Sequence, residues 1–178
     1  MSLAGFSRIV VIGSSGSGKT TFARRVAEVL RVPHLELDSI HWGPNWQPRS
    51  DFLERVRSAV SAEQWVIEGN YRAVRELVWQ RAEALVWLNL PLRIVLARAT
   101  RRTLARIRNG EPTHGGNRET LLRTLFSPNG IPWWIIRSHG RRRREYRRLF
   151  HGAAYAHLRV FEVTSDDEAN DLLLQSPA

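Results

Sequence analysis

The chain has 178 residues and a formal net charge of +10, from 27 basic and 17 acidic side chains. Its length suits one domain with a buried core, and a hydrophobic content of 43% with seven tryptophans excludes a disordered chain. No apolar run approaches the roughly 18 residues that span a bilayer, and the first residues lack the pattern of a secretory signal. Cysteine is absent, which excludes disulfides and thiolate metal sites, so we expect a cytoplasmic protein without a membrane span.

A phosphate-binding loop is predicted near the start of the chain. Residues 8–12 are a short β-branched run, typical of a buried strand, and apolar residues recur at helical spacing from Lys19 to about Arg31. The segment between them fits the pattern G-x-x-x-x-G-K-[ST] and contains the only lysine of the chain. It consists of Gly13, Ser14, Ser15, Gly16, Ser17, Gly18, Lys19 and Thr20.

The chemistry of this loop points to ATP and Mg²⁺ as cofactors. Backbone N–H groups at a helix N-terminus favour a bound phosphate, and Lys19 is expected to reach the β- and γ-phosphate oxygens. We expect the Thr20 hydroxyl to ligate Mg²⁺ and Thr21 to lie in the same nucleotide site. The alternative is a plain glycine and serine turn before an ordinary helix.

The rest of the chain alternates between strand and helix patterns. Apolar runs predict strands at residues 34–37, 65–67, 85–90 and 158–163, and helical spacing predicts helices at 52–60, 73–81, 92–108, 131–150 and 169–174. Ser50 or Asp51 can cap the first of these helices, and Ser165 with Glu168 forms a capping box before the last. The alternation predicts an α/β fold whose parallel sheet is covered by helices on both faces. Ligands of such sheets bind at the carboxyl ends of the strands.

Two acids follow predicted strands and are candidates for the site. Asp38 comes after the second strand, where a carboxylate can hold Mg²⁺ or accept the proton of an attacking hydroxyl; it can also be a turn cap. Glu68 comes after the third strand and can hold Mg²⁺ through water, or be a buried hydrogen-bonded acid. Arg72 can bind a phosphate with both of its terminal nitrogens, or lie on a helix surface.

A tryptophan-containing loop spans residues 42–48. Trp42 and Trp46 can form an apolar wall for an acceptor, or only attach the loop to the body of the protein. His41 is expected to have a structural role. No group of His, Asp and Glu has the spacing of metal ligands, so the only metal we expect arrives with the nucleotide.

The positive charge is concentrated in one segment. Residues 1–92 carry a net charge of +2, residues 93–159 carry +13 and residues 160–178 carry −5. Arg98, Arg102 and Arg106 are four residues apart, on one helix face, and a glycine-containing stretch at 109–118 can be the hinge or tip of a mobile cover. The six arginines of residues 141–148 spread around their helix, so some can meet phosphates, others nucleic acid, and others only solvent.

Five segments together resemble bacterial DNA topology modulation (FlaR-like) proteins, which look like relatives of the adenylate kinases. They are the phosphate loop, residues 37–46, Trp65–Tyr71, residues 116–119 (Gly-Asn-Arg-Glu) and the late arginine run. The resemblance covers nearly the whole chain. It implies a P-loop NTPase fold like that of nucleoside-monophosphate kinases, with three α/β/α layers and a five-stranded parallel sheet. Residues 1–178 would be one domain, with 98–150 as a helical, arginine-rich lid.

The same resemblance implies roles for single residues. Residues 68–72, Glu-Gly-Asn-Tyr-Arg, align with the Asp-Gly-Phe-Pro-Arg motif of adenylate kinases. Glu68 would hold a Mg²⁺-bound water and Arg72 the acceptor's phosphate. Arg98 and Arg102 match a spaced arginine pair before the lid, one beside the nucleotide base and one on phosphate.

Two hypotheses of function follow. The first is an ATP-dependent phosphotransferase that acts on a small-molecule or nucleotide acceptor, with Lys19, Asp38, Glu68, Arg72 and Arg102 in catalysis. The second is an ATP-binding, nucleic-acid-binding protein that affects DNA topology. A regulatory GTPase is disfavoured, because its Asn-Lys-x-Asp motif needs a second lysine. The acceptor and the oligomeric state are not predicted.

Overall fold

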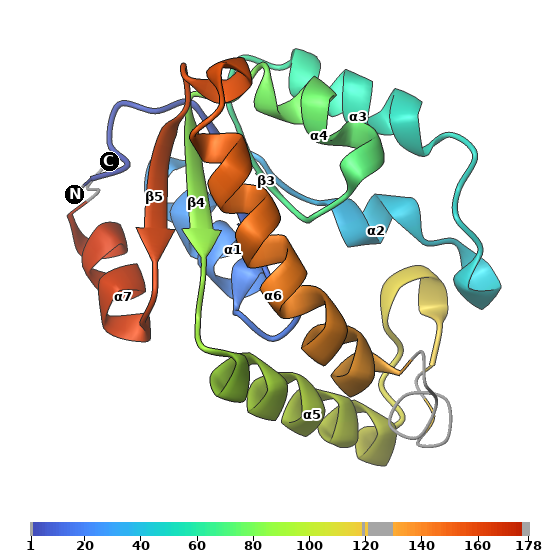
Figure 1. The fold of residues 1–178 in the computed structure, drawn as a ribbon. Coiled ribbons are helices and arrows are strands. Elements are labelled where there is room, and N and C mark those ends of the chain that lie inside the picture. Colours follow the sequence, from blue (N-terminus) through green and yellow to red (C-terminus); the bar gives the residue numbers. More distant parts are fainter. Residues whose placement is uncertain (1, 119, 121–129, 176–178) are drawn as a thin grey trace.

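Five parallel strands form one sheet in the order β2-β3-β1-β4-β5 (Figure 1). The computed structural model describes residues 2–118, 120 and 130–175. The strands are β1 (Arg8–Gly13), β2 (His34–Glu36), β3 (Trp65–Glu68), β4 (Ala84–Leu88) and β5 (Arg159–Val163). In the register of the central strand, Val10 lies opposite Ile67 of β3 and Leu85 of β4. The predicted α/β fold with a five-stranded parallel sheet is confirmed.

Helices cover both faces of the sheet, because successive residues of a strand point to opposite sides. Ile9 and Val11 of β1 pack with α1 (Lys19–Leu30) and α7 (Asp166–Leu174) on one face. Val10 and Ile12 pack on the other face, in a core shared with α3 (Phe52–Ser61), α4 (Arg72–Trp79) and α6 (Ile131–Phe150). The three-layer arrangement is therefore confirmed.

Two helices frame the end of the sheet where a ligand is expected. Helix α5 (Leu92–Asn109) lies beyond the carboxyl end of β4 (Figure 1), and its buried Val95 and Ala99 pack against Ile135 of α6. The far end of α6 lies in the core, where Tyr146 is 2% exposed and packs among aromatic rings from α4, β4 and α6 itself. Half of α6 is thus a core helix, although it belongs to the segment 98–150 expected as the lid. Movement of that segment stays a prediction.

Several strand ends differ from the expected ones by one or two residues, and those of β2 and β3 affect the site. Strand β2 ends at Glu36, because Leu37 is 3% exposed and turns into the core to begin α2 (Leu37–His41). A Cβ at Gly69 would lie 2.8 Å from the Leu37 Cβ, so this turn depends on glycine at that position. Asp38 therefore lies in the first turn of a short helix. Glu68, expected just after a strand, is the last residue of β3.

One of the two predicted caps is confirmed. Ser165 Oγ accepts a 3.2 Å hydrogen bond from the Glu168 N–H at the start of α7. Asp51 stands at the N-cap position of α3, but its carboxylate accepts from the guanidinium groups of Arg49 and Arg55 and not from a backbone N–H of the helix. Residue 119 and residues 121–129, part of the expected lid and of the Gly-Asn-Arg-Glu segment, lie outside the described residues. None of the helices in the described part combines the length and apolar character that crossing a bilayer requires.

Candidate active site

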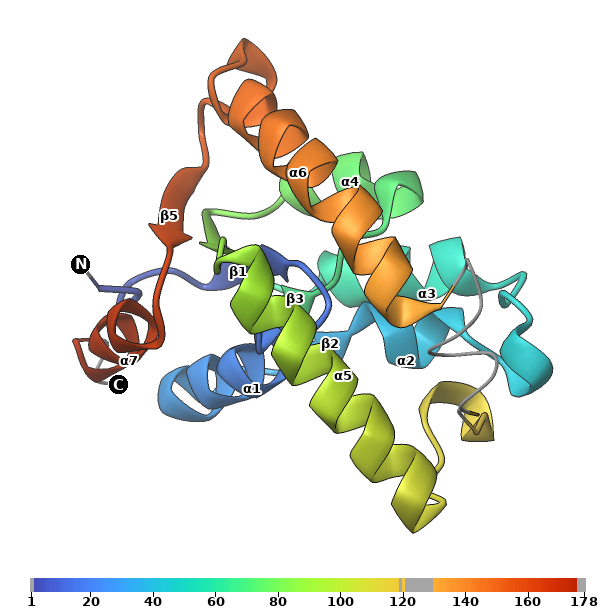
Figure 2. The same ribbon diagram turned by 60° about the horizontal axis from the view of Figure 1, so that its bottom comes forward.

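The phosphate-binding loop connects β1 to α1 at the carboxyl end of the central strand, and Figure 2 views this end of the sheet with α1, α2, α5 and α6 around it. Gly16 has a φ of +82°, and a Cβ there would lie 2.2 Å from the carbonyl oxygen of Val95. Only glycine fits between the loop and α5 at this position. Gly18, with a φ of +89°, is the N-cap of α1, so the free N–H groups of the helix follow directly on the loop.

The expected Mg²⁺ ligands lie next to Lys19. The Thr20 hydroxyl donates a 2.8 Å hydrogen bond to Glu68 Oε1, and Glu36 Oε1 lies 3.5 Å from the same hydroxyl. The Lys19 Nζ is within 3.5 Å of the Ser14 carbonyl oxygen. Glu68 is 1% exposed, and its Oε2 has no hydrogen-bond partner among the described residues. A set of hydroxyl and carboxylate oxygens with one oxygen still unpaired fits Mg²⁺ or its bound water.

The ionisation of Glu68 depends on these neighbours. Burial raises the pKa of Glu68 above its ordinary value, while the Lys19 ammonium group and the Thr20 hydroxyl lower it. Glu36 and Asp38 also raise this pKa, because their carboxylates lie nearby. Negative charge therefore accumulates at this end of the sheet, and a bound cation would offset it.

Asn70 connects β3 to the phosphate loop, a role that no sequence motif indicated. Its Nδ2 donates to the Gly13 carbonyl oxygen at 2.5 Å, and its Oδ1 accepts from the Gly13 N–H at 3.2 Å. The Tyr146 hydroxyl donates to the same Oδ1 at 3.2 Å. One signal in the sequence indicated that these positions differ from those of adenylate kinases. Asn70 and Tyr71 stand where the adenylate kinase motif has Phe and Pro.

Tyr71, the other residue that departs from the adenylate kinase motif, holds Asp38 in place. The Tyr71 hydroxyl donates a 2.5 Å hydrogen bond to Asp38 Oδ1. Burial, and then the nearby Asp38 carboxylate, raise the pKa of Tyr71 well above its ordinary value, so its hydroxyl remains a donor. His41 packs against the rings of Phe52 and Tyr71, in agreement with the structural role expected for it.

A cleft of about 700 Å³ opens beside the phosphate loop and brings most of the predicted side chains together. Its wall includes Ser15, Lys19, Thr20, Thr21, Asp38, Arg72 and Arg102. Arg102 on α5 donates to the Ser15 Oγ at 3.2 Å. Gly13, Ser14, Gly16, Ser17 and Gly18 form the body of the loop outside this wall, and Glu68 lies outside it too.

Two predicted arginines are placed differently from the rest. Arg98 is not in the wall of the cleft; its guanidinium forms a two-pronged ion pair with Asp166 on α7. Arg72 borders the cleft, but its side chain is 81% exposed and its Nε lies 3.7 Å from Glu145. A role for Arg98 beside the nucleotide base would require the ion pair with Asp166 to open.

Three tryptophans also line the cleft. Trp42 and Trp46 meet at nearly right angles with their ring centroids 5.8 Å apart, and Trp46 has a left-handed backbone with φ +58°. Trp134 on α6 lies 4.4 Å beneath the guanidinium of Arg142. Burial lowers the pKa of Arg142, and its Nη1 has no hydrogen-bond partner in the described part of the chain. Of the six arginines in residues 141–148, Arg142 is the one that lines the cleft.

A buried amide joins the tryptophan loop to the turn that follows α5. Asn117 is 7% exposed; its Nδ2 donates to the carbonyl oxygens of Gly43 (2.9 Å) and His114 (2.7 Å). Its Oδ1 accepts from the Trp46 N–H at 3.0 Å. The turn at His114–Gly116, within the stretch expected as hinge or tip of a cover, is thus fixed against the loop of Trp42 and Trp46.

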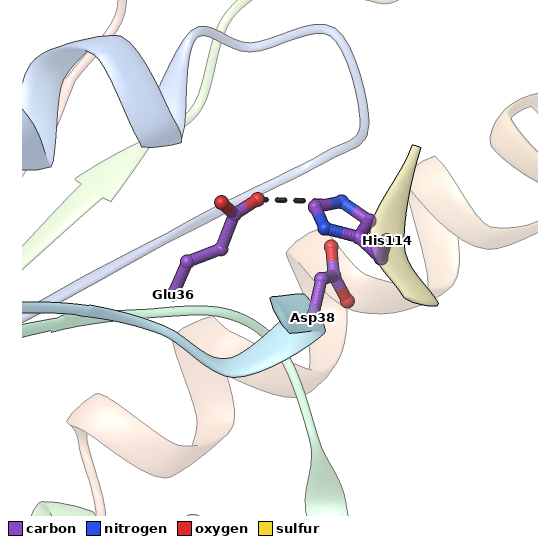
Figure 3. Close-up of side chains that lie close together, drawn as sticks. All are labelled: Glu36, Asp38 and His114. Atoms are coloured by element: carbon purple, nitrogen blue, oxygen red, sulfur yellow. Dashed lines mark ion pairs between the residues drawn. The ribbon is translucent and has the colours of Figure 1, made fainter. Parts of the chain in front are cut away.

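The turn also brings a histidine to two acids, which sequence spacing did not predict. His114 faces Glu36 at the end of β2 and Asp38 on α2 (Figure 3). Its Nε2 lies 3.4 Å from Glu36 Oε1, and one ligand atom of each residue lies within 4.8 Å of the other two. The expectation that His, Asp and Glu form no such group was wrong. His114 is far from both acids in the sequence, and the fold brings it next to them.

Comparisons with known proteins identify the fold. No family model and no curated protein matches the chain. A shikimate kinase from Acinetobacter baumannii, solved with shikimate, is 21% identical, covers 96% of this chain and 90% of its own, with a TM-score of 0.58. A shikimate kinase from Bacteroides thetaiotaomicron is 17% identical and covers 96% of both chains, with a TM-score of 0.54. A gluconokinase from Sinorhizobium meliloti 1021 is 18% identical and covers 94% of this chain and 91% of its own, with a TM-score of 0.52. The chain therefore has the fold of P-loop kinases.

Proposed function

We propose that this protein is an ATP-dependent kinase that transfers the γ-phosphate of ATP to a small-molecule or nucleotide acceptor. One observation carries the proposal: Thr20, hydrogen-bonded to the buried Glu68, and Lys19 both border a cleft that continues to Asp38. The likeness in fold to structures described as shikimate kinases and a gluconokinase supports the same class of reaction.

ATP would bind at the phosphate loop. Backbone N–H groups of the loop and the Lys19 ammonium would bind its β- and γ-phosphates. Thr20 and Glu68 would hold Mg²⁺, which neutralises phosphate charge when it is bound. Arg102, already hydrogen-bonded to Ser15 of the loop, would stabilise the charge that develops on the transferred group.

The acceptor would bind between Asp38 and the tryptophans. Its hydroxyl oxygen would attack the γ-phosphorus while the bond to the bridging oxygen of ADP breaks, and Asp38 would take the hydroxyl proton. Tyr71 fixes Oδ1 of Asp38, which orients the carboxylate for this role. Trp42 and Trp46 would form an apolar wall, and Arg72 would bind an anionic group of the acceptor.

A panel of acceptors tests this function. Purified protein, ATP and Mg²⁺ would be incubated with hydroxylated carboxylic acids, sugar acids and nucleoside monophosphates, and ADP release would be measured with each. We expect one class to stimulate ADP release, and Lys19→Ala to abolish the stimulation. Absence of any acceptor-dependent release across the panel would contradict the proposal.

Nucleic-acid binding is the second candidate, and a specific surface favours it. Four arginines of the late run are exposed on α6: Arg141, Arg144, Arg147 and Arg148. Kinship with the topology modulation proteins stays part of this proposal. Binding through phosphates would weaken steeply with salt and would survive Lys19→Ala. A micromolar, salt-sensitive affinity for DNA without any acceptor would favour this candidate over the kinase.

A further inference from the structure

We propose that Glu36, Asp38 and His114 bind a divalent first-row transition-metal ion, separate from the Mg²⁺ expected with ATP. All three side chains line the cleft, and they converge from β2, α2 and the turn after α5 (Figure 3). The proposal does not depend on phosphotransfer, because the protein without nucleotide already contains all three ligands.

The spacing of the ligand atoms suits a metal ion. Bonds from zinc to nitrogen or oxygen are about 2.0–2.2 Å, so two ligands of a tetrahedral ion lie roughly 3.4 Å apart. His114 Nε2 and Glu36 Oε1 are 3.4 Å apart. A ligand atom of Asp38 lies within 4.8 Å of those of both other residues, so Asp38 would have to turn towards them to complete three-point coordination.

The types of ligand select the class of ion. Mg²⁺ and Ca²⁺ prefer sites built only from oxygen, whereas an imidazole nitrogen with two carboxylates suits Zn²⁺, Co²⁺ and similar ions. His114 and Glu36 have side chains 23% and 22% exposed, so both ligands are partly removed from water. Three protein ligands beside an open cleft leave coordination positions for oxygen atoms of a bound molecule.

A third carboxylate beside this group adds negative charge that a cation would offset. Glu68 is the register partner of Glu36 on the neighbouring strand. It is 1% exposed, and its Oε2 lacks a hydrogen-bond partner among the described residues. Glu36 and Glu68 end two adjacent strands, and Asp38 follows in the first turn of α2, so three carboxylates lie at this edge of the sheet. Glu36 Oε1 also lies 3.5 Å from the Thr20 hydroxyl, so this carboxylate borders both the Mg²⁺ position and the position of the proposed second ion.

The ion would connect the core to the turn that carries His114. Asn117 joins that turn to the tryptophan loop, so both sides of the cleft would be fixed at once. A metal-bound carboxylate is a poor base, so Asp38 cannot bind the ion and accept a proton at the same time. A bound ion is therefore expected to compete with phosphotransfer through Asp38.

The test is a calorimetric titration of the tag-free, nucleotide-free protein with Co²⁺ in the presence of excess Mg²⁺. It measures the affinity and the number of Co²⁺ ions bound per chain. We expect one ion per chain, and broadening of the His114 side-chain signals in NMR by the paramagnetic ion. His114→Gln and Glu36→Gln should each weaken Co²⁺ binding at least roughly tenfold. His151→Gln changes an exposed histidine at the end of α6 and should leave the affinity unchanged.

Three outcomes would overturn the proposal. They are no uptake of Co²⁺, undiminished affinity in His114→Gln, and an equal loss of affinity in His151→Gln, which would indicate adventitious binding to surface histidines. Circular dichroism of each variant shows that it is folded, and His114, on a turn, can be changed without altering the core. The titration contains no ATP, so failure of the proposed kinase activity would not affect its result.

Discussion

The side-chain amide of Asn70 pairs with the backbone of Gly13 in both directions, as donor to its carbonyl oxygen and as acceptor from its N–H. Gly13 is the last residue of β1 and the first of the phosphate loop. One side chain thus fixes the point where the central strand becomes the loop.

Asn70→Ala is expected to lower the free energy of unfolding by about 1–3 kcal/mol, because it leaves buried polar groups of Gly13 unpaired. Urea unfolding measures this change. The matched control is Asn170→Ala, which removes an exposed amide that binds Arg25 and should cost much less. Equal stability of the two variants would show that the contacts to Gly13 contribute little.

Gly16→Ala should disrupt the phosphate loop. The added Cβ would meet the Val95 carbonyl oxygen at 2.2 Å, in a backbone conformation with φ +82°. Gly116 provides the control, since its φ is +73° but a Cβ there meets nothing within 4 Å. Thermal unfolding should show a loss of about 1 kcal/mol for Gly116→Ala, from conformation alone, and a larger loss for Gly16→Ala. A smaller effect at Gly16 would mean that α5 moves away easily.

Glu68→Gln separates the charge of this residue from its shape. The substitution keeps an oxygen that accepts from Thr20 but removes the carboxylate charge proposed for Mg²⁺ binding. We expect kcat to fall roughly 10- to 100-fold and more Mg²⁺ to be needed for half-maximal rate. Stability should be retained or increased, because a buried charge is removed. The exposed Glu63→Gln is the control, and an unchanged Mg²⁺ requirement in Glu68→Gln would exclude this role.

Stability is expected to fall as the solution is acidified below the ordinary histidine range. His139 is 5% exposed, with its Nδ1 3.0 Å from the Ser14 hydroxyl; burial, and then Arg143, lower its pKa. The unfolded chain, with a histidine pKa of about 6.5, binds the proton more readily than the folded chain does. The contribution of His139 is thus complete above pH 6.5 and is lost as the pH falls towards the lowered pKa.

His139→Asn tests this pH dependence. The slope of unfolding free energy against pH, at most about 1.4 kcal/mol per pH unit for each such histidine, should become shallower below pH 6.5. It should not vanish, because burial also lowers the pKa of His34 and His41. His151→Asn, at an exposed position, should keep the original slope. Identical slopes in the two variants would rule out His139 as a contributor.

Local sequence patterns predicted the strands, the phosphate loop and the first helix, because these elements are formed by residues that are close in the sequence. The run of residues 8–12, the glycines and Lys19 lie within a dozen residues, so strand, loop and helix were predicted in order. The strand positions followed from apolar runs for the same reason. The end of β2 was placed one residue late because Leu37 is apolar, and only its contact with Gly69 shows that it begins a helix.

Contacts between distant segments were beyond prediction from one sequence. Arg98 has the spacing of a phosphate-binding arginine, but its partner Asp166 lies on the last helix. The arginines of residues 141–148 are nearly alike in sequence, and only the packing of α6 selects Arg142 for the cleft. His114 gave no signal at all, since both acids that it faces come from the other half of the chain.

The path of α6 has a consequence for how two ligands would affect each other. Trp134 in its first turn and Arg142 just past its middle line the cleft. Tyr146, one turn after Arg142, donates from its hydroxyl to the Asn70 amide that fixes Gly13. A molecule that shifts the start of this helix therefore acts on the phosphate loop through one rigid element. Such linkage is reciprocal: if the acceptor strengthens ATP binding by some factor, ATP strengthens acceptor binding by the same factor.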